Sequence, residues 1–346
     1  MSSPHSDSLA DVIRGQHNAS LERLIPPAVS QQLAILTRHL PTKITSLWGY
    51  ELPVDKPEVS SDFLLCLHEA NVCNEVMQTD AGLRDVITEP LHDRLRELIT
   101  RWADPADRVG QVISNFWLEY DYDGVLPGQV SPNLFFGPKG NCRLLEVVSA
   151  SRQIFEQLSP QEMPKGTYPF LVRCMSLLGP AGGITQIGQM LARRENRLRL
   201  FIQHLPVQGI LPYLRRLDYP HADNPLLIAQ LDRCYQLADR VDVDIDITDR
   251  IGSQLGLECY FNTTEKAIWF LDDLTGRGLC VPQKYQLLRE HLLNIQPTTD
   301  DPLVPFFSHV KVGFHPDKGF SSKVYIGYAR RSIASAVIHT QPVKIP

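Results

Sequence analysis

Glu119 is the acidic residue with the clearest catalytic potential in this sequence. It stands between Leu118 and Tyr120 in the run WLEYDY, where polar and apolar residues alternate. Such alternation is typical of a β-strand with two unlike faces. A carboxylate inside a protein is costly to desolvate unless it is paired, so stability alone explains it poorly. Glu119 is therefore a candidate general base, and the structural alternative is a buried ion pair with Arg199 or Lys323.

A second group of acids lies in the run VDVDID, in which aspartates alternate with valine and isoleucine. These acids are Asp242, Asp244 and Asp246. On an interior face they could bind a metal ion or donate protons, and their mutual repulsion would raise at least one pKa. On an ordinary exposed strand the same pattern would carry no function. The sequence leaves both interpretations open.

A polar residue, a spacer and an aromatic residue recur four times along the chain. The four copies are Asn133-Leu134-Phe135, Arg199-Leu200-Phe201, Glu258-Cys259-Tyr260 and Lys323-Val324-Tyr325. They follow one another at intervals of roughly 60 residues, which indicates an internal structural repeat.

Each copy belongs to the second half of a predicted β-hairpin. The hairpins cover residues 116–138, 184–203, 241–261 and 306–328. Turn-forming residues such as Gly124, Asn196 and Gly319 separate their strands. One period earlier, residues 44–70 predict a fifth, weaker hairpin. The repeat therefore predicts ten strands.

Helices are predicted between the hairpins. They fall within residues 9–40, 74–103, 143–160, 168–178, 225–241, 262–274 and 282–294. Asn262 and Glu265 have capping-box spacing at the start of one helix, and Pro225 has the N1 position of another. Hairpins are antiparallel by construction, which excludes a parallel doubly wound sheet. Closing ten strands into a barrel removes exposed edges. The sequence thus predicts an α+β fold, with a ten-stranded antiparallel β-barrel ringed by α-helices.

The alternation also predicts which side chains face the barrel interior. In the run SHVKVGF, His309 and Lys311 would point inward, while Val310 and Val312 would pack against helices. The interior would then be polar, charged and lined by aromatic side chains. An open sheet with its polar face in solvent is the alternative. A helix after every hairpin and an aromatic residue in every repeat favour the barrel.

This pattern resembles the PT barrel of the aromatic prenyltransferases, the ABBA enzymes, whose repeat is helix–strand–strand–helix. The resemblance covers roughly residues 44–330, and in motif form it is nearest to the indole prenyltransferases of the dimethylallyltryptophan synthase group. Those enzymes carry a hydrophobic-x-Glu-aromatic strand, whose glutamate Glu119 matches. They also repeat Lys/Arg-x-Tyr on second strands, a form that Lys323-Val324-Tyr325 matches.

The resemblance implies transfer of an allyl group from an isoprenoid diphosphate to an electron-rich aromatic acceptor, such as an indole. Glu119 would take the acceptor's proton. The cations that would hold the diphosphate are Arg197, Arg199, Lys311 and Lys323. The aromatic side chains that would shield the allyl cation are Trp117, Phe135, Phe201, Tyr260 and Tyr325. No cofactor is implied as a requirement, although Mg²⁺ could bridge the aspartates and the diphosphate.

The sequence departs from the family pattern at the expected cations. Asn133 and Glu258 replace a basic residue, and Gly256 stands where a further one is expected. Each missing cation weakens the hold on a diphosphate, and nearby aspartates repel it. One alternative is a cyclase or isomerase of the same fold that uses the interior aspartates as proton donors. The other is a non-catalytic barrel that binds a hydrophobic or cationic small molecule. Glu258 is a further candidate acid beside the three aspartates.

Composition indicates the general class of protein and excludes several kinds of partner. The 346 residues are 43% hydrophobic and 21% charged, as in soluble globular proteins, and the net charge of -5 gives no support to a nucleic-acid partner. No apolar run approaches the roughly 20 residues of a membrane span, and no secretory signal begins the chain. Seven scattered cysteines without a CxxC indicate reduced thiols and a cytoplasmic protein. We expect a flexible tail over residues 1–8 and a single domain over residues 9–346.

Overall fold

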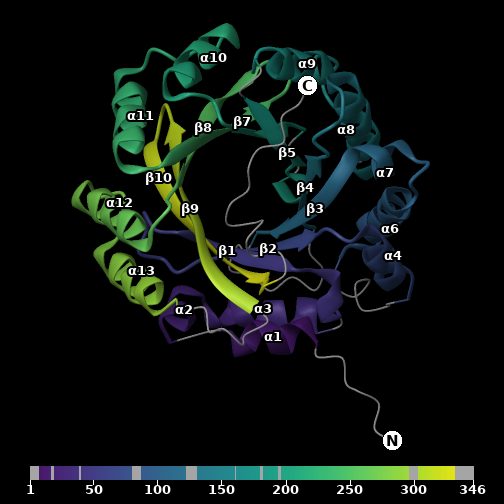
Figure 1. The fold of residues 1–346 in the computed structure, drawn as a ribbon, viewed down its shortest axis with the longest axis horizontal. Coiled ribbons are helices and arrows are strands. Elements are labelled where there is room, and N and C mark those ends of the chain that lie inside the picture. Colours follow the sequence, from purple (N-terminus) through teal and green to yellow (C-terminus); the bar gives the residue numbers. More distant parts are fainter. Residues whose placement is uncertain are drawn as a thin grey trace, which may run out of the picture.

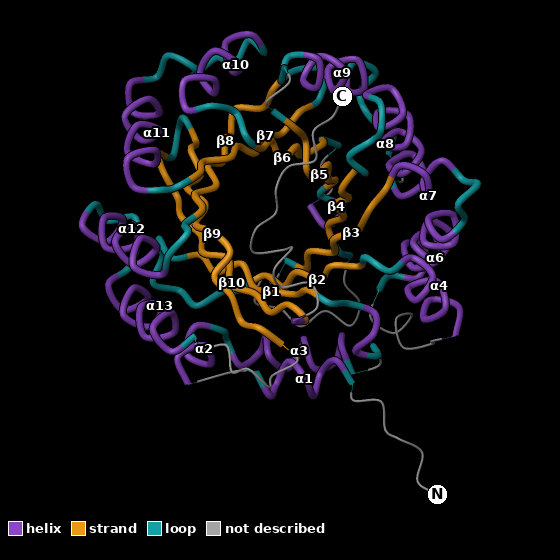
Figure 2. The backbone as a smooth tube through the Cα atoms, in the orientation of Figure 1, coloured by secondary structure: helices purple, strands orange, loops and turns teal. Residues whose placement is uncertain are grey.

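Ten strands form one closed antiparallel barrel, in the order β1-β10-β9-β8-β7-β6-β5-β4-β3-β2. The computed structural model describes residues 8–16, 19–38, 40–79, 87–121, 131–159, 161–179, 182–193, 196–295 and 303–331. Every strand pairs with its neighbours in sequence, and the first and last strands close the barrel. The predicted antiparallel barrel is therefore confirmed, and Figure 2 shows its strands as an inner ring surrounded by helices.

The strands correspond to the five predicted hairpins. They are β1 (Leu47–Pro53), β2 (Asp62–Leu67), β3 (Ile113–Tyr120), β4 (Asn133–Pro138), β5 (Gly183–Gln189), β6 (Leu198–Gln203), β7 (Arg240–Ile247), β8 (Ile251–Tyr260), β9 (Leu303–His315) and β10 (Gly319–Arg330).

The helices lie around the outside of the barrel (Figure 1). Those within the described residues are α1 (Leu9–Gly15), α2 (Ala19–Leu24), α3 (Pro27–Thr37), α4 (Ala70–Thr79), α6 (Glu89–Ala103), α7 (Arg108–Val112), α8 (Leu144–Leu158), α9 (Thr167–Ser176), α10 (Ile210–Arg216), α11 (Pro225–Leu237), α12 (Thr264–Gly276) and α13 (Pro282–Asn294). The short helices α7 and α10 were not predicted, because a helix of five to seven residues carries too few apolar positions to show a period.

Local signals set several helix ends. Pro225 begins α11, and the Asn224 side chain accepts a hydrogen bond from the Leu226 amide at 2.9 Å. The N-cap of α12 is Thr263, whose hydroxyl accepts from the Lys266 amide, so the capping box predicted at Asn262 is one residue early. The helix predicted to reach residue 241 ends at Leu237, because β7 begins three residues later.

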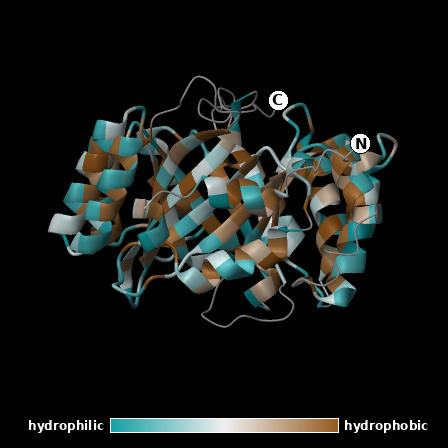
Figure 3. Ribbon diagram, turned by 90° about the horizontal axis from the view of Figure 1, so that it is seen from below, coloured by the Kyte–Doolittle hydropathy of each residue, from teal (hydrophilic) through white to brown (hydrophobic). Residues whose placement is uncertain are grey.

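The hydrophobic core fills the layer between the barrel wall and the helices. Outward-facing residues of β7 and β9 such as Val243, Ile245, Val310 and Val312 are at most 1% exposed. Figure 3 shows hydrophilic and hydrophobic bands alternating along the strands. This alternation is the predicted one: apolar side chains pack outward against helices, and polar side chains point inward.

Some predicted features fall outside the described residues. These are the tail over residues 1–7, the turn over residues 122–130, residues 194–195 within the second hairpin, and residues 332–346. Ser8, which was assigned to the tail, belongs to the fold, because its side chain caps α1.

All seven cysteines are buried and free of disulfide bonds. No helix among the described residues is long and apolar enough to cross a membrane.

Candidate active site in the barrel interior

Strand register decides which interior side chains become neighbours. Lys311 on β9 lies opposite both Glu258 on β8 and Lys323 on β10. Arg199 on β6 lies opposite Asp246 on β7. The Cα atoms of directly opposite residues on antiparallel strands are about 4.5–5.5 Å apart. Charged residues that lie far apart in the sequence are thereby brought together on one interior wall.

Every predicted diphosphate-binding cation is ion-paired with an interior carboxylate. Arg199 Nε lies 2.8 Å from Asp246 Oδ1 and 3.6 Å from Asp244 Oδ2. Arg197 Nη1 lies 3.4 Å from Asp246 Oδ2, and Lys311 Nζ lies 2.5 Å from Asp244 Oδ2. An anionic ligand would therefore have to compete with these carboxylates for the cations.

Lys323 is paired with Glu51, which is not among the predicted site residues. Its ammonium donates to one oxygen of Glu51, and the Tyr325 hydroxyl donates to the other. Burial alone would raise the pKa of Glu51, but Lys323, and then Lys311, hold it well below its usual value. A signal was available in the sequence, since Glu51 alternates with Tyr50 and Leu52 just as Glu119 alternates with its neighbours.

The pair between Asp244 and Lys311 explains Gly256. A Cβ at this position would lie 1.5 Å from Asp244 Oδ1 and 2.7 Å from Lys311 Cε. The space in which a basic side chain was expected is thus filled by an ion pair from the two flanking strands.

Glu119 is buried and belongs to a polar cluster with Asp121, Asn133 and Arg193. Asn133 Nδ2 donates to Glu119 Oε1 at 3.2 Å, and Arg193 Nη2 lies 3.3 Å from the same oxygen. Arg193 binds Asp121 more closely, at 2.7 Å. Burial, with Glu51 and Asp121 adding to it, raises the pKa of Glu119 to about 7. A carboxyl group with this pKa can exchange protons near neutral pH.

Glu119 does not form the ion pair with Arg199 or Lys323 that was its predicted structural alternative. The nearest cation is Arg193, whereas Arg199 and Lys323 pair with Asp246 and Glu51. Arg193 lies in a short 3-10 helix, Leu191–Arg193, after β5. No alternating pattern marks such a turn, so the sequence offered no signal for this residue.

The interior acids on β7 and β8 differ in their tendency to hold a proton. Burial raises the pKa of Asp242 to about 6, although Arg240 Nε lies 3.1 Å from its Oδ2. Burial, followed by the charges of Asp244 and Asp242, raises the pKa of Glu258 to about 8. Asp246 differs: burial would raise its pKa, but the charge and hydrogen bond of Arg199, together with the charges of Arg197 and Lys311, lower it. Glu258 is thus the better proton donor, and Asp246 remains ionised.

The predicted aromatic side chains form two groups in the interior. In the first, Trp117 and Phe135 stand opposite one another on β3 and β4. The Phe135 and Phe201 rings meet edge to face at 5.6 Å, and the Lys311 ammonium lies 5.7 Å from the Phe201 centroid. Phe135 covers Gly188, where a Cβ would lie 1.9 Å from its ring.

The second group crosses β8, β9 and β10. The His309 ring stacks on Tyr325 at 4.1 Å and lies 4.9 Å from Tyr260. The Arg240 guanidinium lies 3.9 Å from the Tyr260 centroid, a cation–π contact. Burial, and then Lys311, lower the pKa of His309 to about 3, so this imidazole is neutral. The π faces of this group could stabilise a carbocation.

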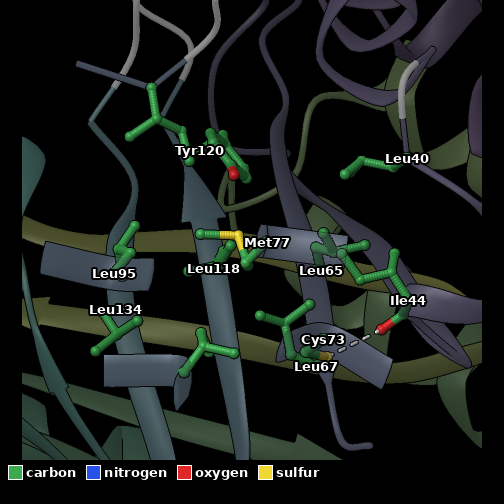
Figure 4. Close-up of a pocket in the computed structure, with 12 residues that line it drawn as sticks. Leu40, Ile44, Leu65, Leu67, Cys73, Met77, Leu95, Leu118, Tyr120 and Leu134 are labelled. Atoms are coloured by element: carbon green, nitrogen blue, oxygen red, sulfur yellow. Dashed lines mark hydrogen bonds between the residues drawn. The ribbon is translucent and has the colours of Figure 1, made fainter. Parts of the chain in front are cut away.

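An apolar pocket lies outside the barrel wall, between β2–β4 and the helices α4 and α6 (Figure 4). Leu65, Leu118, Leu134, Met77 and Leu95 are among its lining residues, and the Cys73 thiol there donates to the Ile44 carbonyl. Its described lining residues include neither a carboxylate nor a cation, so the barrel interior is the candidate site. Within the described residues, no group of three or more His, Cys, Asp or Glu side chains is placed to hold a metal ion.

Several solved structures share this fold, among them two of prenyltransferase PriB. The apo form of prenyltransferase PriB matches 92% of this chain and 96% of its own, with 13% identity and a TM-score of 0.54. PriB in a binary complex with product diphosphate matches 98% of this chain and 100% of its own, with 14% identity and a TM-score of 0.52. AnaPT from Neosartorya fischeri matches 91% and 90%, with 13% identity and a TM-score of 0.51.

At these identities the likeness establishes the fold, and the predicted resemblance to the PT-barrel family is confirmed at that level. No protein-family model matches the sequence, and no curated protein sequence matches it.

Proposed function

We propose that this protein is a prenyltransferase-type enzyme that moves an allyl group from an isoprenoid diphosphate to an electron-rich aromatic acceptor, such as an indole. One observation carries the proposal: Lys311 and Lys323 stand directly opposite one another on the interior face of β9 and β10. Like charges in this position destabilise a sheet. Asp244 and Glu51 balance the charges of this lysine pair, and a bound diphosphate could take their place. PriB, which has the same fold, has been solved with product diphosphate.

The proposed roles follow from the contacts. The diphosphate would displace Asp244 from Lys311 and Glu51 from Lys323, and these cations would neutralise the leaving group. The two aromatic groups would shield the allyl cation as the C–O bond breaks. The acceptor would form the new bond to the allyl carbon and lose a proton to Glu119, whose pKa of about 7 suits a general base.

A cyclase or isomerase remains the second candidate, because one observation favours it. All four predicted diphosphate cations are already paired, and Glu258 has a pKa raised to about 8. Such a group could protonate an alkene directly and start a carbocation reaction without a diphosphate.

Titration with an allyl thiolodiphosphate, with and without Mg²⁺, tests the proposal. Saturable binding is expected, and Arg199→Ala and Lys323→Ala should each weaken it by at least about tenfold, since each removes one charge-assisted contact. Arg101→Ala is the matched control, because Arg101 pairs with Asp107 on the outer side of the barrel. Calorimetry on protein of verified fold provides the affinities.

The results separate the candidates. No binding of the analogue, with or without Mg²⁺, removes the transferase. Binding and turnover of a neutral polyene would favour the cyclase. Binding of a small molecule with no turnover would favour a non-catalytic barrel.

A further inference from the structure

Glu258 differs from the other buried acids of the barrel interior. Glu51, Glu119, Asp242, Asp244 and Asp246 each have a Lys or Arg nitrogen within 4 Å. Glu258 has no such partner among the described residues, although Lys311 stands opposite it, because Lys311 turns to Asp244. The nearest basic nitrogen is His309 Nε2, 3.9 Å from Glu258 Oε1.

One oxygen of Glu258 lacks a hydrogen-bond partner. The Tyr260 hydroxyl donates to Oε2 at 3.1 Å, whereas Oε1 is buried with no partner in the part of the chain that the structure describes. The residue itself is 3% exposed. Buried polar atoms are normally satisfied, so an orphaned one at an interior wall points to a ligand that supplies the missing bond.

The surroundings keep this carboxyl group protonated at neutral pH. Burial is the main cause of its raised pKa, Asp244 and Asp242 add to it, and Lys311 and the Tyr260 hydrogen bond oppose it. The titratable and charged groups that face it are Asp242 and Asp244 from β7, Tyr260 from β8, His309 and Lys311 from β9, and Tyr325 from β10. Since Oε2 accepts from Tyr260, the proton belongs on Oε1.

Strand register sets Glu258 in line with the lysine pair. Glu258, Lys311 and Lys323 occupy opposite positions on three consecutive strands, β8, β9 and β10. The Cα atoms of neighbours in such a row are about 4.5–5.5 Å apart. The three side chains can therefore reach one diphosphate. The row thus offers two ammonium groups and one carboxylic acid.

We propose that Glu258 is a catalytic general acid, which donates the Oε1 proton to the leaving diphosphate where a cation would otherwise stand. This inference rests on the proposed transferase function and deepens it. As the allylic C–O bond breaks, its electron pair goes to the diphosphate, and the proton of Glu258 goes to a diphosphate oxygen. The carboxylate left behind lies opposite Lys311 and recovers a proton from solvent once the products leave.

The variant Glu258→Gln tests the proton transfer, because glutamine keeps a hydrogen-bond donor and carries no transferable proton. Affinity for the thiolodiphosphate should stay within about threefold, while the single-turnover rate should fall by about 10²–10⁴. The wild-type rate should also decline as pH rises through about 8, and the variant should lose that alkaline limb. Glu290→Gln, an exposed acid on α13, is the matched control.

A second measurement tests the proposal even if Glu258→Gln does not fold. Calorimetry at pH 9 in two buffers of different ionisation enthalpy counts the protons taken up when the thiolodiphosphate binds. In the Glu119→Gln background, which removes the other glutamate with a pKa near neutrality, uptake should approach one proton.

Glu258→Gln with the wild-type rate and pH profile would overturn this inference and leave the proposed function standing. So would zero proton uptake at pH 9 with the analogue bound. A wild-type protein that binds no diphosphate at any pH would overturn both.

Discussion

At the scale of single residues, two buried glutamates carry the proposed proton transfers. Glu119 on β3 and Glu258 on β8 have pKa values raised to about 7 and about 8, in each case mainly by burial. A group that titrates near the working pH can both give and take a proton. In the proposed transfer, Glu119 works as the base in its ionised form, and Glu258 works as the acid in its neutral form.

The variant Glu119→Gln should separate catalysis from structure. Turnover should fall by about 10²–10⁴, because glutamine cannot accept the proton that the acceptor loses. The melting temperature should hardly change, since the Gln oxygen still accepts from Asn133 and Arg193 keeps its closer bond to Asp121. Steady-state kinetics and thermal melts check both values.

Asp121→Asn is the matched control, because Asp121 shares the contacts to Arg193 and Asn133. It should lower the melting temperature more than Glu119→Gln does and reduce turnover less. If Glu119→Gln melts early yet keeps its turnover per folded molecule, Glu119 is a structural residue.

At the scale of elements, three adjacent strands, β7, β8 and β9, build a charged wall of the interior. Asp244 of β7 reaches across Gly256 of β8 to Lys311 of β9. The absence of a side chain on the middle strand allows an ion pair between the two outer strands. The charge balance of this wall is therefore a property of the three strands together.

Gly256→Ala should disrupt this wall. The added methyl group would overlap Asp244 Oδ1, so the carboxylate must move and its bond to Lys311 must break. Overpacking of this kind typically costs about 1–3 kcal/mol, and the melting temperature should drop by several degrees. Gly276→Ala at the end of α12 is the control, because no atom lies within 4 Å of the new Cβ. Equal melting temperatures for the two variants would contradict this account of Gly256.

At the scale of the whole molecule, the barrel closes where its first and last strands meet. β1 and β10 pair from Leu47 with Ala329 to Pro53 with Lys323. The ion pair of Glu51 with Lys323 crosses this seam. Closure removes the last free edges and encloses the charged interior, so the stability of the fold becomes linked to interior protonation.

The melting temperature should accordingly fall as pH rises from about 6.5 to about 8, and then level off as far as these groups are concerned. Glu119 and Glu258 have raised pKa values in the folded protein, so their contribution is complete below about 4.5 and is lost as pH rises through 7 to 8. His309 and Asp246 have lowered pKa values, and their contributions are lost instead as pH falls. In Glu258→Gln the melting temperature should fall less over this pH range. Melts across pH 5 to 9 measure it, and identical slopes for variant and wild type would refute the assignment.

The sequence alone determined the architecture and the faces of the strands. Side chains alternate across a strand, so the runs around Glu119, Lys311 and the three aspartates already predicted which residues point inward. The recurring motif predicted ten strands, and antiparallel hairpins joined in sequence order leave a closed barrel as the arrangement without edges. These features depend on local pattern, which a sequence displays directly.

Only the tertiary structure decided which charges meet. Lys311 pairs with Asp244 and not with Glu258, which stands opposite it, and Glu51 and Arg193 hold partners that no motif indicated. Ion pairing depends on distances between strands that are remote in sequence and on the reach of each side chain. Raised and lowered pKa values depend in turn on burial and on those partners. The sequence therefore supplied the interior acids and cations, and three-dimensional packing decided that Glu258 has no Lys or Arg partner within the described parts of the chain.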